Sequence, residues 1–200
     1  MISTIIFDLN QVIVNFNYSK SDKNYIKLLG VKCDEFWRKS ANHYFELDTG
    51  KISGIQYLKI LLNEFNVDEN EYQKLKDLMF NDLVLVDGTL DIIKKLKKNY
   101  KLILLAADSE EFSNIKIKKY NLNKYFDEIF ISYKFGITKN NPEIYQKVLN
   151  KIHVKHKNCI FIDDNDIYLK AAQKAGIKKV IKFINSTKLK KELAQFNITL

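Results

Sequence analysis

The chain has 200 residues, of which 46% are hydrophobic, and a formal net charge of +9. This length suits one domain, or a core with one inserted subdomain, and it is sufficient to bury a sizeable core. No apolar stretch of the sequence approaches the length of a membrane span, and no charged and apolar leader precedes the first predicted strand. We therefore expect a soluble, cytoplasmic protein without a membrane partner.

The positive charge is unevenly distributed along the chain. Residues 14–86 carry 10 basic and 11 acidic side chains, so the excess lies in the remaining segments. Lysines gather there on predicted helices, in the clusters Lys94, Lys95, Lys97, Lys98 and Lys116, Lys118, Lys119. Because these clusters lack the interleaved aromatic residues of a base-stacking surface, we interpret them as solvated faces and expect no nucleic-acid partner.

Four apolar segments are typical of buried parallel strands that end in a polar or special residue. The first is the run 4–14, which delivers Asp8 at its end, and the others are 101–108, 128–132 and 159–164. Amphipathic helical patterns lie between them. This alternation predicts an α/β fold, a Rossmann-like three-layer core with a parallel sheet and right-handed crossovers. Residues 178–184 are predicted to form a fifth strand, and 186–196 a closing helix.

From Tyr18 to about Leu85 the pattern changes to amphipathic helices without strands. We predict a core formed by residues 1–15 and 86–200, with residues 16–85 as a helical insert. Ser53 is expected to cap one of its helices. We interpret the aromatic residues of the insert as packing residues, and we leave open whether two of its acids face a site or only a solvated turn. These aromatic and acidic residues are Trp37, Tyr44, Phe45, Glu46 and Asp48.

The acidic strand ends predict a site at one edge of the sheet. Parallel order brings the carboxyl ends of strands together, so Asp8, the 106–107 turn and the pair Asp163 and Asp164 should share one rim. Three carboxylates there would repel one another, and a hard cation such as Mg²⁺ is the usual remedy. Lys139 could neutralise the charge of a phosphate. A carboxylate, a metal and a cation are the parts that phosphoryl transfer to an aspartate nucleophile needs.

Four segments in order along the chain carry a family resemblance. Residues 7–12, 104–107, 136–145 and 161–164 resemble the first, second, lysine and fourth motifs of the haloacid dehalogenase-like (HAD) superfamily. The first motif is most similar to those of small bacterial sugar-phosphate phosphatases, and the helical insert occupies the place of the family's α-helical type 1 cap. The resemblance implies a Mg²⁺-dependent phosphatase of a small phosphorylated metabolite, in which Asp8 is phosphorylated and then hydrolysed.

The resemblance also implies a role for each motif residue. The catalytic residues would be Asp8, Asn10 and Lys139, and the phosphate would be held by Ala106, Ala107 and Lys139. Mg²⁺ would be held by the Asp8 carboxylate, the Asn10 backbone carbonyl and Asp164, with Asp163 ligating or orienting a metal-bound water.

Two motif positions depart from the family pattern. Asn10 stands where most members have a second aspartate, and general acid–base catalysis is typically worth about 10²- to 10⁴-fold. Ala106 stands where a Ser or Thr hydroxyl normally contacts the phosphoryl group, a donor worth on the order of 10²- to 10³-fold. Lesser departures are Ala107, Asn140 and Tyr168, at positions where the family commonly has Asn, Pro and Asn.

Three functions stay open at this point. The first is a weak or specialised phosphatase, and the second is a catalytically inactive member that binds phosphate or a partner. The third, a dehalogenase that uses Asp8 without metal, is disfavoured because that chemistry has no need for Asp163 and Asp164. We interpret Asp108 as a loop cap in preference to a substitute polar contact. The sequence determines neither the substrate nor the oligomeric state.

Overall fold

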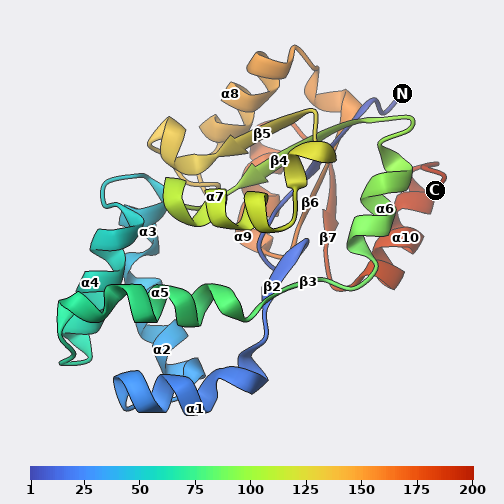
Figure 1. Ribbon diagram of the computed structural model, residues 1–200. Coiled ribbons are helices and arrows are strands. Elements are labelled where there is room, and N and C mark those ends of the chain that lie inside the picture. Colours follow the sequence, from blue (N-terminus) through green and yellow to red (C-terminus); the bar gives the residue numbers. More distant parts are fainter.

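The computed structural model describes the backbone of residues 1–200 and the side chains of all of them except residues 18–21. A five-stranded parallel sheet with the order β5-β4-β1-β6-β7 forms its centre (Figure 1). The strands are β1 (Thr4–Phe7), β4 (Lys101–Ala106), β5 (Glu128–Ile131), β6 (Cys159–Asp163) and β7 (Lys179–Lys182). This sheet confirms the predicted α/β fold and its fifth strand.

Helices cover both faces of the sheet. Because successive side chains of a strand point to opposite faces, Ile5 and Phe7 belong to one apolar cluster and Ile6 to the other. The first cluster includes side chains of α6 (Thr89–Leu96) and of the predicted closing helix α10 (Ser186–Gln195), and the second includes those of α8 (Pro142–Ile152) and α9 (Asp166–Lys174). The result is the predicted three-layer core.

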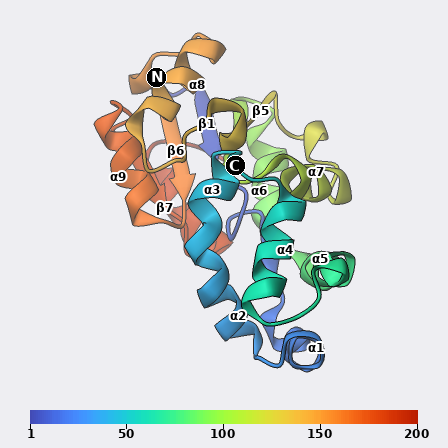
Figure 2. The same cartoon turned by 90° about the vertical axis from the view of Figure 1, so that its left-hand side faces the viewer.

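The helices between β2 (Val14–Phe16) and β3 (Leu83–Leu85) lie together beside the carboxyl ends of the parallel strands (Figures 1 and 2). They are α1 (Tyr18–Leu29), α2 (Cys33–Ser40), α3 (Tyr44–Asp48), α4 (Gly54–Glu64) and α5 (Tyr72–Asn81). Ser53 caps helix α4 as predicted. Its Oγ accepts a hydrogen bond from the Gln56 amide at 3.1 Å, while Gln56 Oε1 accepts one from the Ser53 amide at 2.8 Å. We refer to residues 16–85 as the helical cap. Within the described chain, no helix combines the length and the apolar character that crossing a membrane requires.

A short ribbon joins the core to the helical cap. Strand β2 (Val14–Phe16) pairs antiparallel with β3 (Leu83–Leu85). The expectation of helices without strands up to Leu85 was therefore wrong at β3, because three residues are too few to show a strand periodicity. The run 4–14 is likewise two strands and not one, since β1 ends at Phe7 and the chain turns at Gln11, which has a φ of +62°. This turn carries Asn10 out of the sheet.

Candidate active site

The register of the sheet places two acids side by side. Phe7 pairs with Ile162 across β1 and β6, so the residues that follow, Asp8 and Asp163, lie next to each other at the carboxyl ends of the two strands. The Asp8 amide continues the ladder and donates to the Ile162 carbonyl at 2.9 Å. From β1 the chain proceeds to β4 and β5 on one side of the sheet and then to β6 and β7 on the other. Such a switch in strand order is where open α/β sheets bind ligands.

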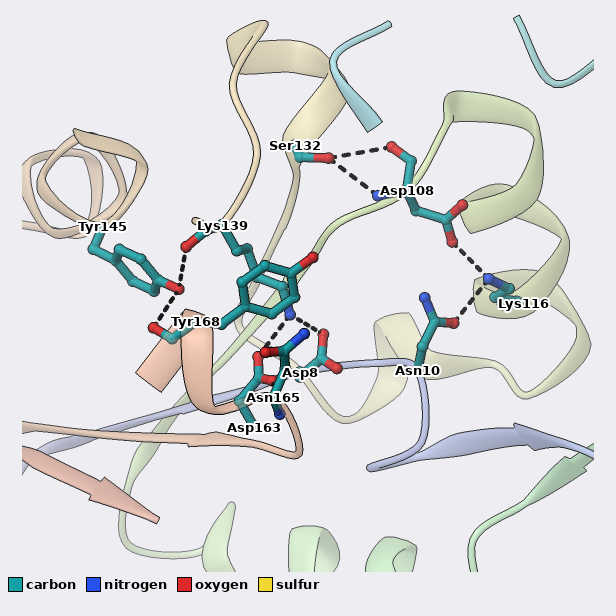
Figure 3. A network of polar contacts seen from close by, with 10 residues as sticks. All are labelled: Asp8, Asn10, Asp108, Lys116, Ser132, Lys139, Tyr145, Asp163, Asn165 and Tyr168. Carbon is teal, nitrogen blue, oxygen red and sulfur yellow. Dashed lines mark hydrogen bonds and ion pairs between the residues drawn. The ribbon is translucent and has the colours of Figure 1, made fainter. Parts of the chain in front are cut away.

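One lysine links these acids. Lys139 lies in the loop before α8 and is 1% exposed. Its Nζ donates to Asp8 Oδ1 and, at 2.7 Å, to Asp163 Oδ2 (Figure 3). Ligand oxygens of Asp8, Asp163 and Asp164 lie within 4.8 Å of one another. We call these four residues the strand-end cluster, and they were the acids and the lysine expected at the rim.

Charge is unbalanced within the strand-end cluster. Burial raises the pKa of Asp8 to about 8, Asp163 adds to the rise, and Lys139 opposes it. Burial disfavours the charged form of Lys139, but the adjacent Asp163 and Asp8 outweigh it and hold the pKa of the ammonium well above its usual range. Burial and the charge of Asp163 also raise the pKa of Asp164. Three carboxylates thus face a single lysine, which is the charge pattern of a site that can accept a cation.

A second buried cluster lies across from the first. Lys116 of α7 (Glu110–Lys119) donates from Nζ to Asp108 Oδ2 at 2.7 Å and to Asn10 Oδ1 at 2.8 Å (Figure 3). Lys116 is 4% exposed and Asp108 is 3% exposed. We call Asn10, Asp108 and Lys116 the α7 cluster.

One sequence interpretation fails at the α7 cluster. The solvated face predicted for Lys116 was wrong, because the residue lies four positions after the buried Phe112 and shares its side of the helix. That spacing could have revealed it. Asp108 combines the two alternatives weighed for it. Its Oδ1 accepts a hydrogen bond from the Ser109 amide at 2.9 Å, as a loop cap does, while its Oδ2 is the buried polar contact to Lys116. The N-cap of α7 itself is Ser109, whose Oγ accepts from the Phe112 amide.

A cavity of about 250 Å³ lies between the two clusters, and side chains of the helical cap form part of its wall. Residues of both clusters line it, and its remaining wall is largely aromatic. The aromatic residues are Phe16, Trp37, Tyr44, Tyr57, Phe80, Phe112 and Tyr168. Trp37 and Tyr44, which we interpreted as packing residues, therefore border the cavity, whereas Phe45 is exposed.

The phosphate-binding positions predicted at the end of β4 are only partly accessible. Ala106 is the last residue of the strand and is fully buried, while Ala107 lines the cavity. The Tyr168 ring lies over the Lys139 ammonium, with 4.6 Å between the ring centroid and Nζ. A bulky aromatic thus covers the lysine at a position that sequence reasoning had marked only as a departure from the family.

Asp48 brings the helical cap to the cavity. Its side chain is half-buried and lines the wall of the cavity. Of the two alternatives left open for Asp48, a residue that faces the site and a residue of a solvated turn, the first therefore holds. Its backbone carbonyl accepts a hydrogen bond from Ser132 Oγ at 2.5 Å, and the same hydroxyl accepts from the Asp108 amide at 3.0 Å. Burial raises the pKa of Asp48 to about 7, and the nearby Asp108 adds to the rise.

Comparisons with known proteins agree with this architecture. D-ribitol-5-phosphate phosphatase of Bacteroides thetaiotaomicron is 29% identical over 195 residues, covering 89% of this chain and 90% of the relative. Flavin mononucleotide hydrolase 1 of Arabidopsis thaliana is 28% identical over 140 residues, 69% of this chain and 57% of that protein. A HAD family enzyme of B. thetaiotaomicron, crystallised with magnesium and inorganic phosphate, superposes with a TM-score of 0.73 at 21% identity, covering 92% and 96% of the two chains. The sequence profile of the haloacid dehalogenase-like hydrolases matches residues 2–176, and the chain therefore belongs to this family.

Proposed function

We propose that this protein is a phosphatase that hydrolyses a small phosphorylated metabolite through a phosphoryl group carried on Asp8. The observation that carries the proposal is the strand-end cluster, in which Lys139 bridges Asp8 and Asp163 in the wall of a cavity. This chain matches 90% of the length of a relative that, by its name, acts on D-ribitol 5-phosphate. Both point to a phosphomonoester as the substrate.

The residues of the strand-end cluster fit Mg²⁺. Oxygens of Asp8, Asp163 and Asp164 lie within 4.8 Å of one another, and carboxylate oxygen is the ligand that this hard cation prefers. We propose that the carboxylates of Asp8 and Asp164 and the backbone carbonyl of Asn10 hold the ion, with Asp163 ligating or orienting a metal-bound water. When bound, Mg²⁺ would offset the excess negative charge of the cluster and of the phosphate.

Within this site Asp8 is the nucleophile. Its carboxylate oxygen forms a bond to phosphorus while the bond from phosphorus to the ester oxygen breaks, and water then cleaves the acyl phosphate. Lys139 holds the Asp8 carboxylate through the bond to Oδ1 and contributes positive charge beside the phosphoryl oxygens. Phosphate contacts from Lys139 and from the chain at Ala106 and Ala107 complete the proposed site. Because Ala106 has no hydroxyl, we expect slower turnover than in relatives that have one.

The proposal is tested with purified protein and a panel of phosphorylated metabolites, with Mg²⁺ and with EDTA. We expect Mg²⁺-dependent release of phosphate and a phosphoryl adduct on the peptide that contains Asp8 after acid quenching. Calorimetry should detect Mg²⁺ binding that is lost in Asp164→Ala and retained in Asp166→Ala, since Asp166 is an exposed acid two residues further along the chain. Absence of phosphate release from every substrate by folded protein would contradict the proposal.

A further inference from the structure

The α7 cluster contains a buried ion pair, Lys116 with Asp108, that the proposed reaction does not use. Lys116 and Asp108 are nearly inaccessible, yet both line the cavity. A buried ion pair is weak evidence for stability, because apolar residues of similar volume often serve at least as well. Its position opposite the strand-end cluster, across the space where a substrate would lie, points to a role in binding or turnover (Figure 3).

The contact with Lys116 fixes the orientation of the Asn10 amide. A lysine ammonium can only donate hydrogen bonds, so the atom of Asn10 that it contacts at 2.8 Å must be the carbonyl oxygen. The amide nitrogen is therefore turned away from Lys116, as Figure 3 shows. Asn10 and Asp8 line the same cavity, so an ester bound at Asp8 would share this cavity with the Asn10 side chain.

This arrangement stabilises negative charge without a proton donor. An amide cannot transfer a proton, but a hydrogen bond that a neighbouring cation polarises is a stronger donor than an isolated amide. Asp108 holds the Lys116 ammonium in place from the other side through its Oδ2, at 2.7 Å. Lys116 thus brings positive charge towards the ester oxygen while Asn10 makes the direct contact.

We propose that Lys116 is a positioning residue that acts through Asn10 to stabilise the departing ester oxygen as an anion, so that the protein favours phosphomonoesters whose alcohol oxygen is weakly basic. The proposal rests on the proposed function. The electron pair of the broken phosphorus–oxygen bond stays on the departing oxygen, which takes its proton from a solvent water. The hydroxide formed is neutralised by the proton released when a second water hydrolyses the acyl phosphate on Asp8.

The cavity wall supports the same substrate class. Weakly basic hydroxyls are those of phenols and enols, whose oxygen is attached to a planar unsaturated group. Among the described side chains, seven aromatic residues line the cavity, and two of them, Phe16 and Trp37, lie with their ring centroids 4.7 Å apart. Such walls pack well against a planar ring. Aryl or enol phosphates therefore match both the wall and the missing proton donor.

The test compares phenyl phosphate with para-nitrophenyl phosphate, which are similar in shape but differ in the basicity of the departing oxygen. Two variants are informative: Asn10→Ala removes the amide, and the double variant Lys116→Met/Asp108→Asn removes both buried charges together. For phenyl phosphate we expect each variant to lower kcat/KM by on the order of 10²-fold. For para-nitrophenyl phosphate we expect a decrease of only about 10-fold. Combining all three substitutions should add little, because the residues act through one contact.

Controls separate this inference from folding and from the proposed function. Lys118→Met changes an exposed lysine of the same helix and should leave both rates as in wild type. A folded double variant that binds Mg²⁺ and keeps the wild-type ratio of the two rates would overturn the inference. If the double variant does not fold, an unchanged ratio in Asn10→Ala overturns it equally. If wild type is no faster than Asp8→Asn on any ester, the proposed function itself has failed and the inference fails with it.

Discussion

The two sides of the cavity differ in how the fold places their residues. The strand-end cluster comes from the ends of β1 and β6 and from the loop before α8, and the register Phe7 to Ile162 fixes its two central acids. The α7 cluster comes from the turn after β1, from the loop between β4 and α7, and from one face of α7. The cluster set by the sheet matches the family motifs, whereas the other departs from them. We infer that the first governs the reaction and the second governs which ester is accepted.

The two clusters also differ in charge. The strand-end cluster has three carboxylates and one lysine, so it retains negative charge that a cation can offset. In the α7 cluster one lysine faces one carboxylate and a neutral amide, which leaves no excess. Substitutions on either side should therefore differ in their effect and in their dependence on Mg²⁺.

The largest effect is expected at the nucleophile. Asp8→Asn keeps the shape of the side chain but removes the attacking carboxylate, so phosphatase activity should fall by at least about 10⁴-fold. Asp166→Asn, at an exposed acid beyond the cluster, should keep wild-type activity. Steady-state kinetics on an aryl phosphate measures the activity of both variants. If the activity of Asp8→Asn lies within about 10-fold of wild type, Asp8 is not the nucleophile and the strand-end cluster has no part in the mechanism.

The next effect concerns the stability of the strand-end cluster. Lys139→Met leaves Asp8 and Asp163 buried without their shared cation, and such a loss typically costs about 3–5 kcal/mol of unfolding free energy. Mg²⁺ should restore part of it by binding the folded state. Urea unfolding with and without Mg²⁺ measures this. The matched control is Lys147→Met, an exposed lysine of α8, which should change stability by no more than about 0.5 kcal/mol.

Restoring the family residues is expected to raise the rate. Asn10→Asp with Ala106→Ser supplies a proton donor and a hydroxyl, so turnover of an aryl phosphate should increase by at least about 10²-fold when Mg²⁺ is present. The new carboxylate would meet Lys116, which now contacts the Asn10 amide. With a proton donor in place, the rate should depend less on the basicity of the departing oxygen. A folded double mutant that binds Mg²⁺ but stays at the background rate would contradict the phosphatase proposal.

The smallest effect concerns pH and the helical cap. Burial raises the pKa of Asp48 from 3.8 to about 7, so between these values the folded protein holds a proton that the unfolded chain has lost. Unfolding free energy should therefore decrease as the pH rises from about 4 to 7, by about 1–2 kcal/mol for this half-buried group. Asp48→Asn should remove that part of the decrease. Urea unfolding at several pH values compares the two proteins, and equal pH dependence would show that Asp48 does not titrate in this range.

The sequence by itself determined the sheet and the acids at its edge. Apolar strands that end in Asp8 and Asp163 must bring these residues to one rim, because parallel strands share the direction of their carboxyl ends. The continuous apolar run Ile5, Ile6 and Phe7 likewise indicated that both faces of the strand are covered, because successive side chains point to opposite faces. These features follow from local periodicity and strand direction, and both can be recognised in the order of residues within each segment.

Only the tertiary structure decided the other side of the cavity. Lys116 and Asn10 are 106 positions apart, and no local pattern indicates that their side chains meet. Strands β2 and β3 are too short for periodicity, and each is defined by its distant partner. Asp48 borders the cavity because the helical cap folds over the sheet edge, where Ser132 holds its carbonyl. Long-range contacts of this kind depend on how whole elements pack, which the order of residues within one element does not contain.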